Sequence, residues 1–160
     1  MKLVKKILAP TDLSELSKAG VRTALEMAIA EKAELIALHV VAYTEVHVHD
    51  EAFYTESLAA LVLKKRRKLL EEFLATDFAD LLPRASLRVE VQVGSPYKKI
   101  VERAAAEEVD LIVMSTHGRA GLAHVLIGSV TEKVVQHATC PVLSIRPVQE
   151  AKLHEGAPLY

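Results

Sequence analysis

Small and polar residues interrupt an apolar run in the last third of the chain. The sequence VDLIVM breaks into STHG at residues 115–118, and the pair Gly128-Ser129 then opens a pattern with helical spacing. Backbone N–H groups at a helix start and the positive end of the helix dipole attract anions. Glycine at 128 allows a close backbone approach, and the Ser129 and Thr131 hydroxyls could donate to phosphate oxygens. This segment is a candidate phosphate site.

Helix capping offers a second physical explanation for the same residues. Ser129 followed by Glu132 has the spacing of a capping box, in which the serine is the N-cap. Asp12 with Glu15 has the same ambiguity, because it can cap the helix after the first strand. Ser95-Pro96 needs no function, since serine is a common N-cap and proline suits the first helical position. Local chemistry leaves phosphate binding and capping both open.

Several common catalytic and binding motifs are absent from the sequence. It contains no G-x-x-x-x-G-K-[ST] of a P-loop nucleotide hydrolase, no G-x-G-x-x-G after the first strand and no G-x-S-x-G nucleophile elbow. His47 and His49 lack a third placed metal ligand, so we interpret them as surface residues. Cys140 is the only cysteine, which excludes an intrachain disulfide and favours a reducing compartment, the cytoplasm. We expect it to be a small buried residue and not a nucleophile.

Short apolar runs alternate with helical patterns along the chain. Helical spacing begins at Ser14, after Pro96 and at Ser129, and the whole order is βαβαβαβαβ. This alternation predicts an α/β fold with a single open, mostly parallel five-stranded sheet and helices on both faces. The run at 86–93 alternates apolar and charged residues, which is typical of an edge strand. The predicted strands are Leu3–Ala9, Glu34–Val41, Ser86–Val93, Val109–Ser115 and Cys140–Ile145.

Polar residues follow three of the predicted strands. The first strand ends in Pro10-Thr11-Asp12, the second in His39-Val40 and the fourth in STHG. In an open parallel sheet, ligands bind beyond the carboxyl ends of the strands, near the point where strand order reverses. The predicted fold therefore brings these residues to one edge.

One domain over residues 1–147 accounts for all the predicted elements. Residues 42–57 form an irregular loop before a long helix, in which KKRRK occupies 64–68. Five consecutive basic residues point all round a helix, so we favour a solvated face over a patch for an anionic partner. Residues 148–160 lack periodicity and are predicted to form a flexible tail.

Composition limits the classes of partner. With 160 residues, 51% of them hydrophobic, and a formal net charge of -1, the chain has the balance of an ordinary globular domain, and we expect no nucleic-acid partner. No run of about 18 apolar residues occurs, so we expect no membrane span.

Five stretches of the sequence, taken in order, are more specific than any single glycine loop. They are KKILAPTDLSELS, LIALHVV, GSPYKKIVERAAAEEVDLIVMSTHGRAGL, IGSVTEKVV and CPVLSIRP. Together they resemble the universal stress protein family over residues 2–147. The resemblance implies a Rossmann-like, adenine-nucleotide α-hydrolase-like fold with strand order 3-2-1-4-5. It also implies a homodimer through the last strand, Cys140–Arg146.

Nucleotide-binding members of that family are similar in a pattern written G-x2-G-x9-G-[ST]. The matching residues here are Ser115, Gly118, Gly128 and Ser129, so serine replaces the first glycine. We expect the loop to form still if Ser115 adopts a negative φ. Its side chain would then either add a hydrogen bond or crowd the ribose.

Carried over by position, the resemblance also implies a set of binding residues. Asp12 and the backbone at Val40 would hold adenine, with Pro10 and Thr11 beside them. Met114 and Ser115 would face the nucleoside. The residues implied around the phosphates are Gly118, Arg119, Gly128, Ser129, Val130 and Thr131, of which Arg119 is the placed cation.

Three functions follow from these observations. The first is a cytoplasmic stress-response protein that binds ATP, with or without Mg²⁺, as a regulatory nucleotide. It would be at most a slow ATPase, because neither His117 nor His124 is an evident general base. The second is a dimeric interaction protein that binds no nucleotide. The third, which rests on the serine at 115, is a binder of AMP or a cyclic nucleotide.

Overall fold

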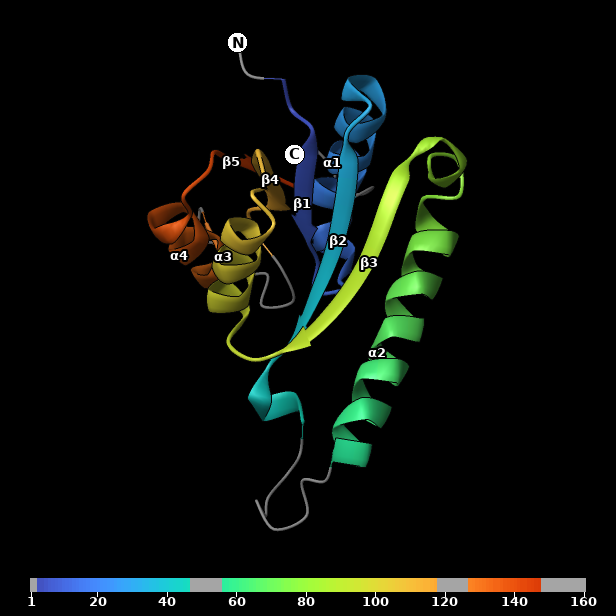
Figure 1. The fold of residues 1–160 in the computed structure, drawn as a ribbon, viewed down its shortest axis with the longest axis vertical. Coiled ribbons are helices and arrows are strands. Elements are labelled where there is room, and N and C mark those ends of the chain that lie inside the picture. Colours follow the sequence, from blue (N-terminus) through green and yellow to red (C-terminus); the bar gives the residue numbers. More distant parts are fainter. Residues whose placement is uncertain (1–2, 47–55, 118–126, 148–160) are drawn as a thin grey trace, which may run out of the picture.

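The computed structural model describes residues 3–46, 56–117 and 127–147, which form a parallel sheet flanked by helices (Figure 1). The strands are β1 (Lys6–Pro10), β2 (Glu34–Val41), β3 (Ser86–Val93), β4 (Leu111–Ser115) and β5 (Val142–Ile145). The helices are α1 (Lys18–Glu31), α2 (Glu56–Asp77), α3 (Pro96–Ala106) and α4 (Ser129–His137). Short 3-10 turns are η1 (Glu15–Ser17), η2 (Tyr43–Glu45) and η4 (Leu82–Arg84).

The order of strands fixes where a ligand can enter. Within the described residues the strands form a five-stranded sheet in the order β3-β2-β1-β4-β5, and each neighbouring pair is parallel. The predicted α/β class and strand order are therefore confirmed. The order reverses between β1 and β4, so the loops after these two strands diverge and leave a crevice at their carboxyl ends.

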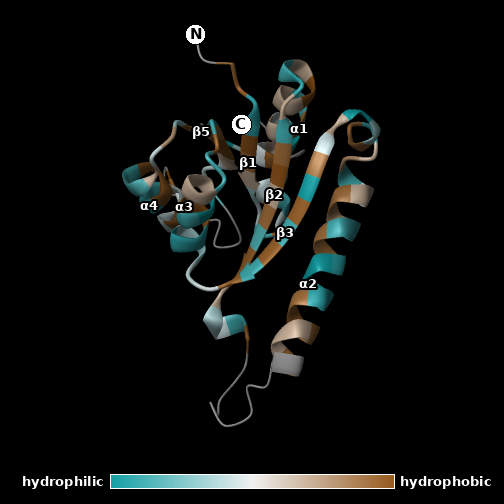
Figure 2. Cartoon of the chain, in the orientation of Figure 1, coloured by the Kyte–Doolittle hydropathy of each residue, from teal (hydrophilic) through white to brown (hydrophobic). Residues whose placement is uncertain are grey.

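Helices cover both faces of the sheet. One apolar cluster joins α1 and α2 to the sheet through residues such as Leu25 and Leu70. A second cluster on the opposite face joins α3 and α4 through residues such as Ile100 and Val134. Because β1, β2 and β4 are covered on both sides, nearly every residue in them is buried, and β1 and β2 are largely apolar in Figure 2.

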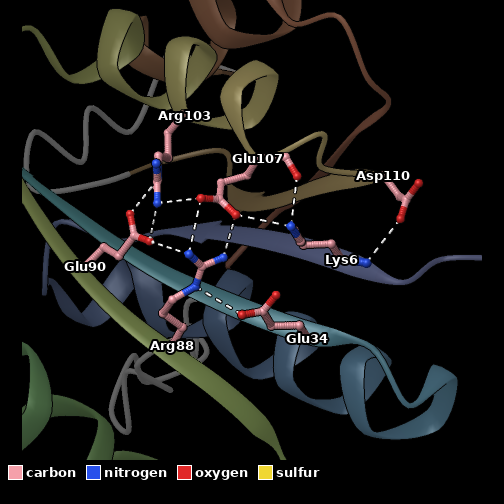
Figure 3. Close-up of polar contacts among 7 residues, drawn as sticks. All are labelled: Lys6, Glu34, Arg88, Glu90, Arg103, Glu107 and Asp110. Atoms are coloured by element: carbon pink, nitrogen blue, oxygen red, sulfur yellow. Dashed lines mark hydrogen bonds and ion pairs between the residues drawn. The ribbon is translucent and has the colours of Figure 1, made fainter.

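The edge strand β3 has one apolar and one charged face. Its apolar side chains pack against the cluster beneath α2, whereas Arg88 and Glu90 lie on the other face beside α3 (Figure 3). Arg103 Nε lies 2.6 Å from Glu90 Oε2, and Arg88 Nη2 lies 2.6 Å from Glu107 Oε2. Ion pairs with α3 thus neutralise the charged face, and the predicted edge position is confirmed.

The strand boundaries differ from the predicted ones where the predicted strand residues do not pair with an adjacent strand. β1 begins at Lys6, which pairs with Glu34, and not at Leu3, whose side chain is 65% exposed. β4 and β5 each begin two residues later than predicted. β2 and β3 have the predicted bounds because they pair along their whole length.

Two helix starts show which capping predictions are correct. Ser14, and not Asp12, is the N-cap after β1, and it caps the 3-10 turn η1 that precedes α1. Pro96 is the first residue of α3 and Ser95 holds the N-cap position, as predicted, although the Ser95 side chain makes no capping hydrogen bond.

The basic run at 64–68 lies in the middle of α2. Its side chains are exposed except Arg66, which is half-buried. Arg67 pairs with Glu71 at 3.0 Å, so part of the charge is neutralised within the helix. The choice between a solvated face and a patch for an anionic partner stays a prediction. Although α2 has 22 residues, neither it nor any other helix in the described ranges is long and apolar enough to span a membrane.

Candidate functional site

A cavity of about 290 Å³ opens at the carboxyl ends of β1, β2 and β4. This is near the lower end of the size range of small-molecule pockets. Its walls come from the loop after β1, the end of β2, η2, the start of α3, the end of β4 and the first turn of α4. The lining residues are Pro10, Thr11, Asp12, Ser17, Leu38, His39, Val40, Glu45, Pro96, Ile100, Met114, Ser115, His117, Gly128, Ser129, Val130 and Thr131.

Hydroxyl and carbonyl groups fix the loop after β1. The Thr11 hydroxyl is 2.8 Å from Ser17 Oγ and accepts from Leu13 N at 3.0 Å. Leu13 has a φ of 65°, a conformation that costs energy for a residue with a branched side chain. His39, which is 1% exposed, has Nδ1 2.9 Å from the Thr11 carbonyl oxygen. Because a carbonyl only accepts, Nδ1 carries the proton and ties β2 to this loop.

Asp12 forms a local turn and does not cap a helix. Its Oδ1 accepts from Ser14 N at 3.1 Å and from Ser14 Oγ at 2.5 Å. Ser14 Oγ in turn accepts from Ser17 N at 3.2 Å. The capping prediction for Asp12 was therefore wrong, and these bonds hold its carboxylate at the pocket wall.

Ser115 occupies a tightly packed position where β4 meets α1. Its Oγ accepts a hydrogen bond from Gly20 N at 2.9 Å. A Cβ on Gly20 would lie 2.5 Å from Ser115 N and 2.8 Å from the Met114 carbonyl carbon, so only glycine allows this approach. The positive-φ residues of the described chain do not include Ser115, as the loop prediction required. The serine at this position adds a hydrogen bond within the protein, and its effect on a bound nucleotide stays a prediction.

The first turn of α4 closes the pocket. Its N-cap is Gly128 and not Ser129, and no side chain in this turn makes a capping bond, so the predicted capping box does not form. Among the hydrogen bonds between described residues, none uses the backbone N–H groups of Ser129, Val130 and Thr131. These three donors lie at the positive end of the helix dipole, and their residues line the cavity.

Thr131 has a different role from the one its sequence position suggests. Its hydroxyl donates to the Ser115 carbonyl oxygen at 2.9 Å, and the residue is 3% exposed. Because a hydroxyl has one proton, the expected donation from this side chain to a phosphate oxygen was wrong. The bond instead attaches α4 to the end of β4.

Gly128 is required by packing inside the protein. Its φ of -68° suits any residue, but a Cβ would lie 2.9 Å from the Thr116 carbonyl oxygen. Gly128 N also donates to that oxygen at 2.6 Å. The glycine therefore needs no ligand to explain it.

The structure also adds lining residues that the sequence did not indicate: Ser17, Leu38, Glu45, Pro96 and Ile100. Glu45 comes from η2 and is paired with Arg66 of α2 at 3.2 Å. Ile100 belongs to the buried face of α3, where its apolar spacing indicated only a core position. Two residues expected at the phosphates, Gly118 and Arg119, lie outside the described residues.

Other candidate sites have less support. The described ranges contain no group of three or more His, Cys, Asp or Glu side chains that could hold a metal. His47, His49 and His124 lie outside the described residues, as does the predicted tail at 148–160. Cys140 is half-buried against the α3–α4 cluster, so the expected full burial was wrong.

Comparison with known proteins decides the family. The model of the universal stress protein family matches residues 4–146. This chain belongs to the universal stress protein family. Universal stress protein MJ0531 of Methanocaldococcus jannaschii is 35% identical over 153 residues, which cover 90% of this chain and 83% of that protein. The solved structure of MJ0577 from the same organism has a TM-score of 0.72 at 30% identity, covering 93% of this chain and 100% of that one.

Two more distant universal stress proteins were solved with adenine nucleotides. One is in complex with cAMP, at 20% identity and a TM-score of 0.58, covering 92% of this chain and 100% of that one. The other, from Arabidopsis thaliana, has AMP bound, at 17% identity and a TM-score of 0.56, covering 90% and 92%. At these identities the likeness shows a shared fold.

Proposed function

We propose that this universal stress protein binds an adenine nucleotide, ATP, in the cavity at the ends of β1, β2 and β4. One observation carries the proposal. Every expected nucleotide-binding residue within the described ranges lines this same cavity, although these residues come from four separate parts of the chain. A core position or a helix cap would not require that convergence.

The two ends of the cavity differ in chemistry, as a nucleotide requires. Ile100 and Met114 supply apolar surface near Val40, where the flat adenine ring would lie. At the other end, three backbone N–H groups of the first turn of α4 suit phosphate oxygens. Mg²⁺, when present, would bind with the phosphates, since Mg²⁺ in proteins is usually held by substrate phosphates with one or two carboxylates.

The bound nucleotide would regulate the protein and would not be a substrate for rapid turnover. His117 lines the cavity, and its Nδ1 lies 2.8 Å from Thr116 Oγ1. The distant relatives with AMP and cAMP support the adenine nucleotide class. Since the Ser115 hydroxyl is directed to Gly20, the serine gives no reason to prefer a cyclic nucleotide.

The substitution Ser129→Glu separates phosphate binding from helix stability. Ser129 is an exposed first residue of α4, where a carboxylate stabilises a helix by about 0.3–1 kcal/mol. The same carboxylate would repel phosphates at the N–H groups beside it. We expect at least a ten-fold loss of ATP affinity by calorimetric titration, with an equal or higher melting temperature, and Ser129→Gln serves as the uncharged control.

Adenosine provides the matched ligand in that titration. Its affinity should be the same for wild type and Ser129→Glu, because it carries no phosphate. Equal ATP affinity for the two proteins would contradict the phosphate assignment. No ATP binding by wild type would favour the nucleotide-independent interaction protein instead.

We also infer a homodimer through the segment Cys140–Arg146. β5 is the edge strand beside β4, and all of its residues are only half-buried. A second copy would cover this edge and its unpaired backbone groups. Light scattering after size exclusion should give twice the mass of the 17.5 kDa chain. A monomeric wild type at micromolar concentration would contradict this inference.

A further inference from the structure

The first turns of α2 carry an apolar segment that is not buried. Residues 58–63, here called the apolar tip, read LAALVL, and every one of these six residues is half-buried or exposed. Leu61 is 62% exposed and Leu58 is 39% exposed. Within the described chain, neither apolar cluster includes a residue of the apolar tip, and the first residue of α2 in the core is Leu70. The core of the domain therefore does not account for this segment.

Basic side chains follow the apolar tip within one helical turn. Lys64 and Lys65 stand three and four residues after Leu61, so they lie beside it on the same side of the helix. Both lysines are exposed, and neither forms an ion pair with another described residue. The other three members of the basic run each pair with a carboxylate at 3.0–3.6 Å. The two cations nearest the apolar tip are thus the ones whose charge is left for a partner.

The position of the apolar tip limits what can cover it. The beginning of α2 extends past the end of β3 in Figure 1, and its apolar colours change to those of the basic run in Figure 2. A protruding helix end is convex, so a protein partner would need a groove of matching shape to cover its leucines. A lipid interface adapts its shape around such an end, and it combines an apolar layer with charged headgroups. The shape and the chemistry of the tip both suit lipid.

We propose that the apolar tip with Lys64 and Lys65 binds the surface of an anionic lipid bilayer from one side, without spanning it. The exposed leucines would enter the interface, and the ammonium groups of the lysines would meet the anionic headgroups. A second copy of this chain fits less well, because two copies that meet at this surface would bring their lysines together. From the sequence alone a solvated face was favoured for the basic run, and the structure adds the exposed leucines beside it. The proposal makes no use of the nucleotide site.

Flotation of the full-length protein with lipid vesicles tests the proposal. The probes are vesicles of phosphatidylcholine alone and vesicles of equal parts phosphatidylcholine and phosphatidylglycerol. We expect binding only to the anionic vesicles, and weaker binding as the salt concentration is raised. Lys64→Gln/Lys65→Gln should lower the partition coefficient by about five-fold for each lysine. Leu61→Gln should lower it by about ten-fold, because leucine no longer enters the interface.

Two matched variants control for charge and for exposed apolar surface elsewhere. Lys5→Gln/Lys98→Gln removes two exposed lysines outside α2 and changes the net charge by the same amount. Leu3→Gln removes a leucine that is 65% exposed near the start of the chain. Both controls should partition within two-fold of wild type. The α2 variants should keep the wild-type melting temperature, because the residues that they replace lie outside the core.

Several results would overturn the proposal. Absence of binding to the anionic vesicles, or equal binding to the neutral ones, would reject an anionic lipid partner. Binding that both α2 variants leave unchanged would place the contact elsewhere, and equal losses in the lysine controls would show a general effect of net charge. A lower oligomer mass of Leu61→Gln in light scattering would assign the surface to a second copy. Binding of polyglutamate without binding of vesicles would assign it to an acidic protein.

Discussion

Replacing Gly20 with alanine would place a methyl group inside the contact between α1 and β4. The new Cβ would lie 2.5 Å from Ser115 N and 2.8 Å from the Met114 carbonyl carbon. Both neighbours are backbone atoms of a buried central strand, so neither can turn away as a side chain would. The helix would have to move outward, and the bond from Gly20 N to Ser115 Oγ would lengthen.

The expected loss of stability can be estimated from three contributions. Overpacking a core contact costs about 1–3 kcal/mol. Weakening the buried hydrogen bond costs about 1 kcal/mol. Alanine is a better helix former than glycine by about 1 kcal/mol, which offsets part of the loss. The net expectation is about 2 kcal/mol, or a melting temperature lower by about 4–8 °C for a chain of 160 residues.

Urea unfolding followed by circular dichroism measures this difference. Ala30→Gly is the matched control, because Ala30 is an exposed position in the same helix and measures helix propensity without the contact. It should lose about 1 kcal/mol. A Gly20→Ala protein that is as stable as wild type, or more stable, would refute the close-packing argument and show that α1 moves away from β4 without cost.

Three further predictions follow from other contacts. Thr131→Val should lower the free energy of unfolding, measured in urea, by about 1–2 kcal/mol, because the Ser115 carbonyl loses its hydrogen-bond donor. Thr131→Ser keeps a hydroxyl and should keep most of the wild-type stability. An equal loss of stability in both variants would contradict a role for the hydrogen bond. The guanidinium of Arg88 lowers the pKa of Glu107 from 4.5 to about 2, so its stabilisation is complete above pH 4.5 and is lost as pH falls toward 2. The melting temperature of wild type should therefore fall more steeply across that window than that of Glu107→Gln, and parallel curves would argue against the pair. Lys32 ends α1 with a φ of 54° and is exposed, so Lys32→Gly should raise thermal stability by about 0.5–1 kcal/mol, whereas a decrease would show that no strain is relieved there.

The sheet could be predicted well because its signals are local. β2 and β3 are bounded runs that pair along their full length, so their sequence limits are their structural limits. The charged face of β3 also indicated an edge, although the sequence did not show that Arg103 of α3 and Glu107 at its C-cap would neutralise it. The start of β1 is set by the first residue that pairs with β2, which is Lys6, and this pairing cannot be predicted from the β1 sequence alone.

The site could be predicted by position but not by bonding. The residues after β1, β2 and β4 meet at one cavity, as the topology required. The role of the Thr131 hydroxyl was missed because its acceptor is 16 residues away, and the Gly20 partner of Ser115 is 95 residues away. Glu45 was missed because it belongs to η2, a short turn after β2 whose place at the cavity is set by tertiary packing and not by a local sequence pattern.

The most direct test of the central claim is an NMR titration of the ¹⁵N-labelled protein with ATP. Binding at the proposed site predicts saturable shifts of the backbone amides of Val40 and of Ser129–Thr131. The amides of the basic run at 64–68 on α2 should stay in place, since that run lies outside the cavity lining. An unchanged spectrum at millimolar ATP, or shifts confined to α2, would contradict nucleotide binding in this cavity.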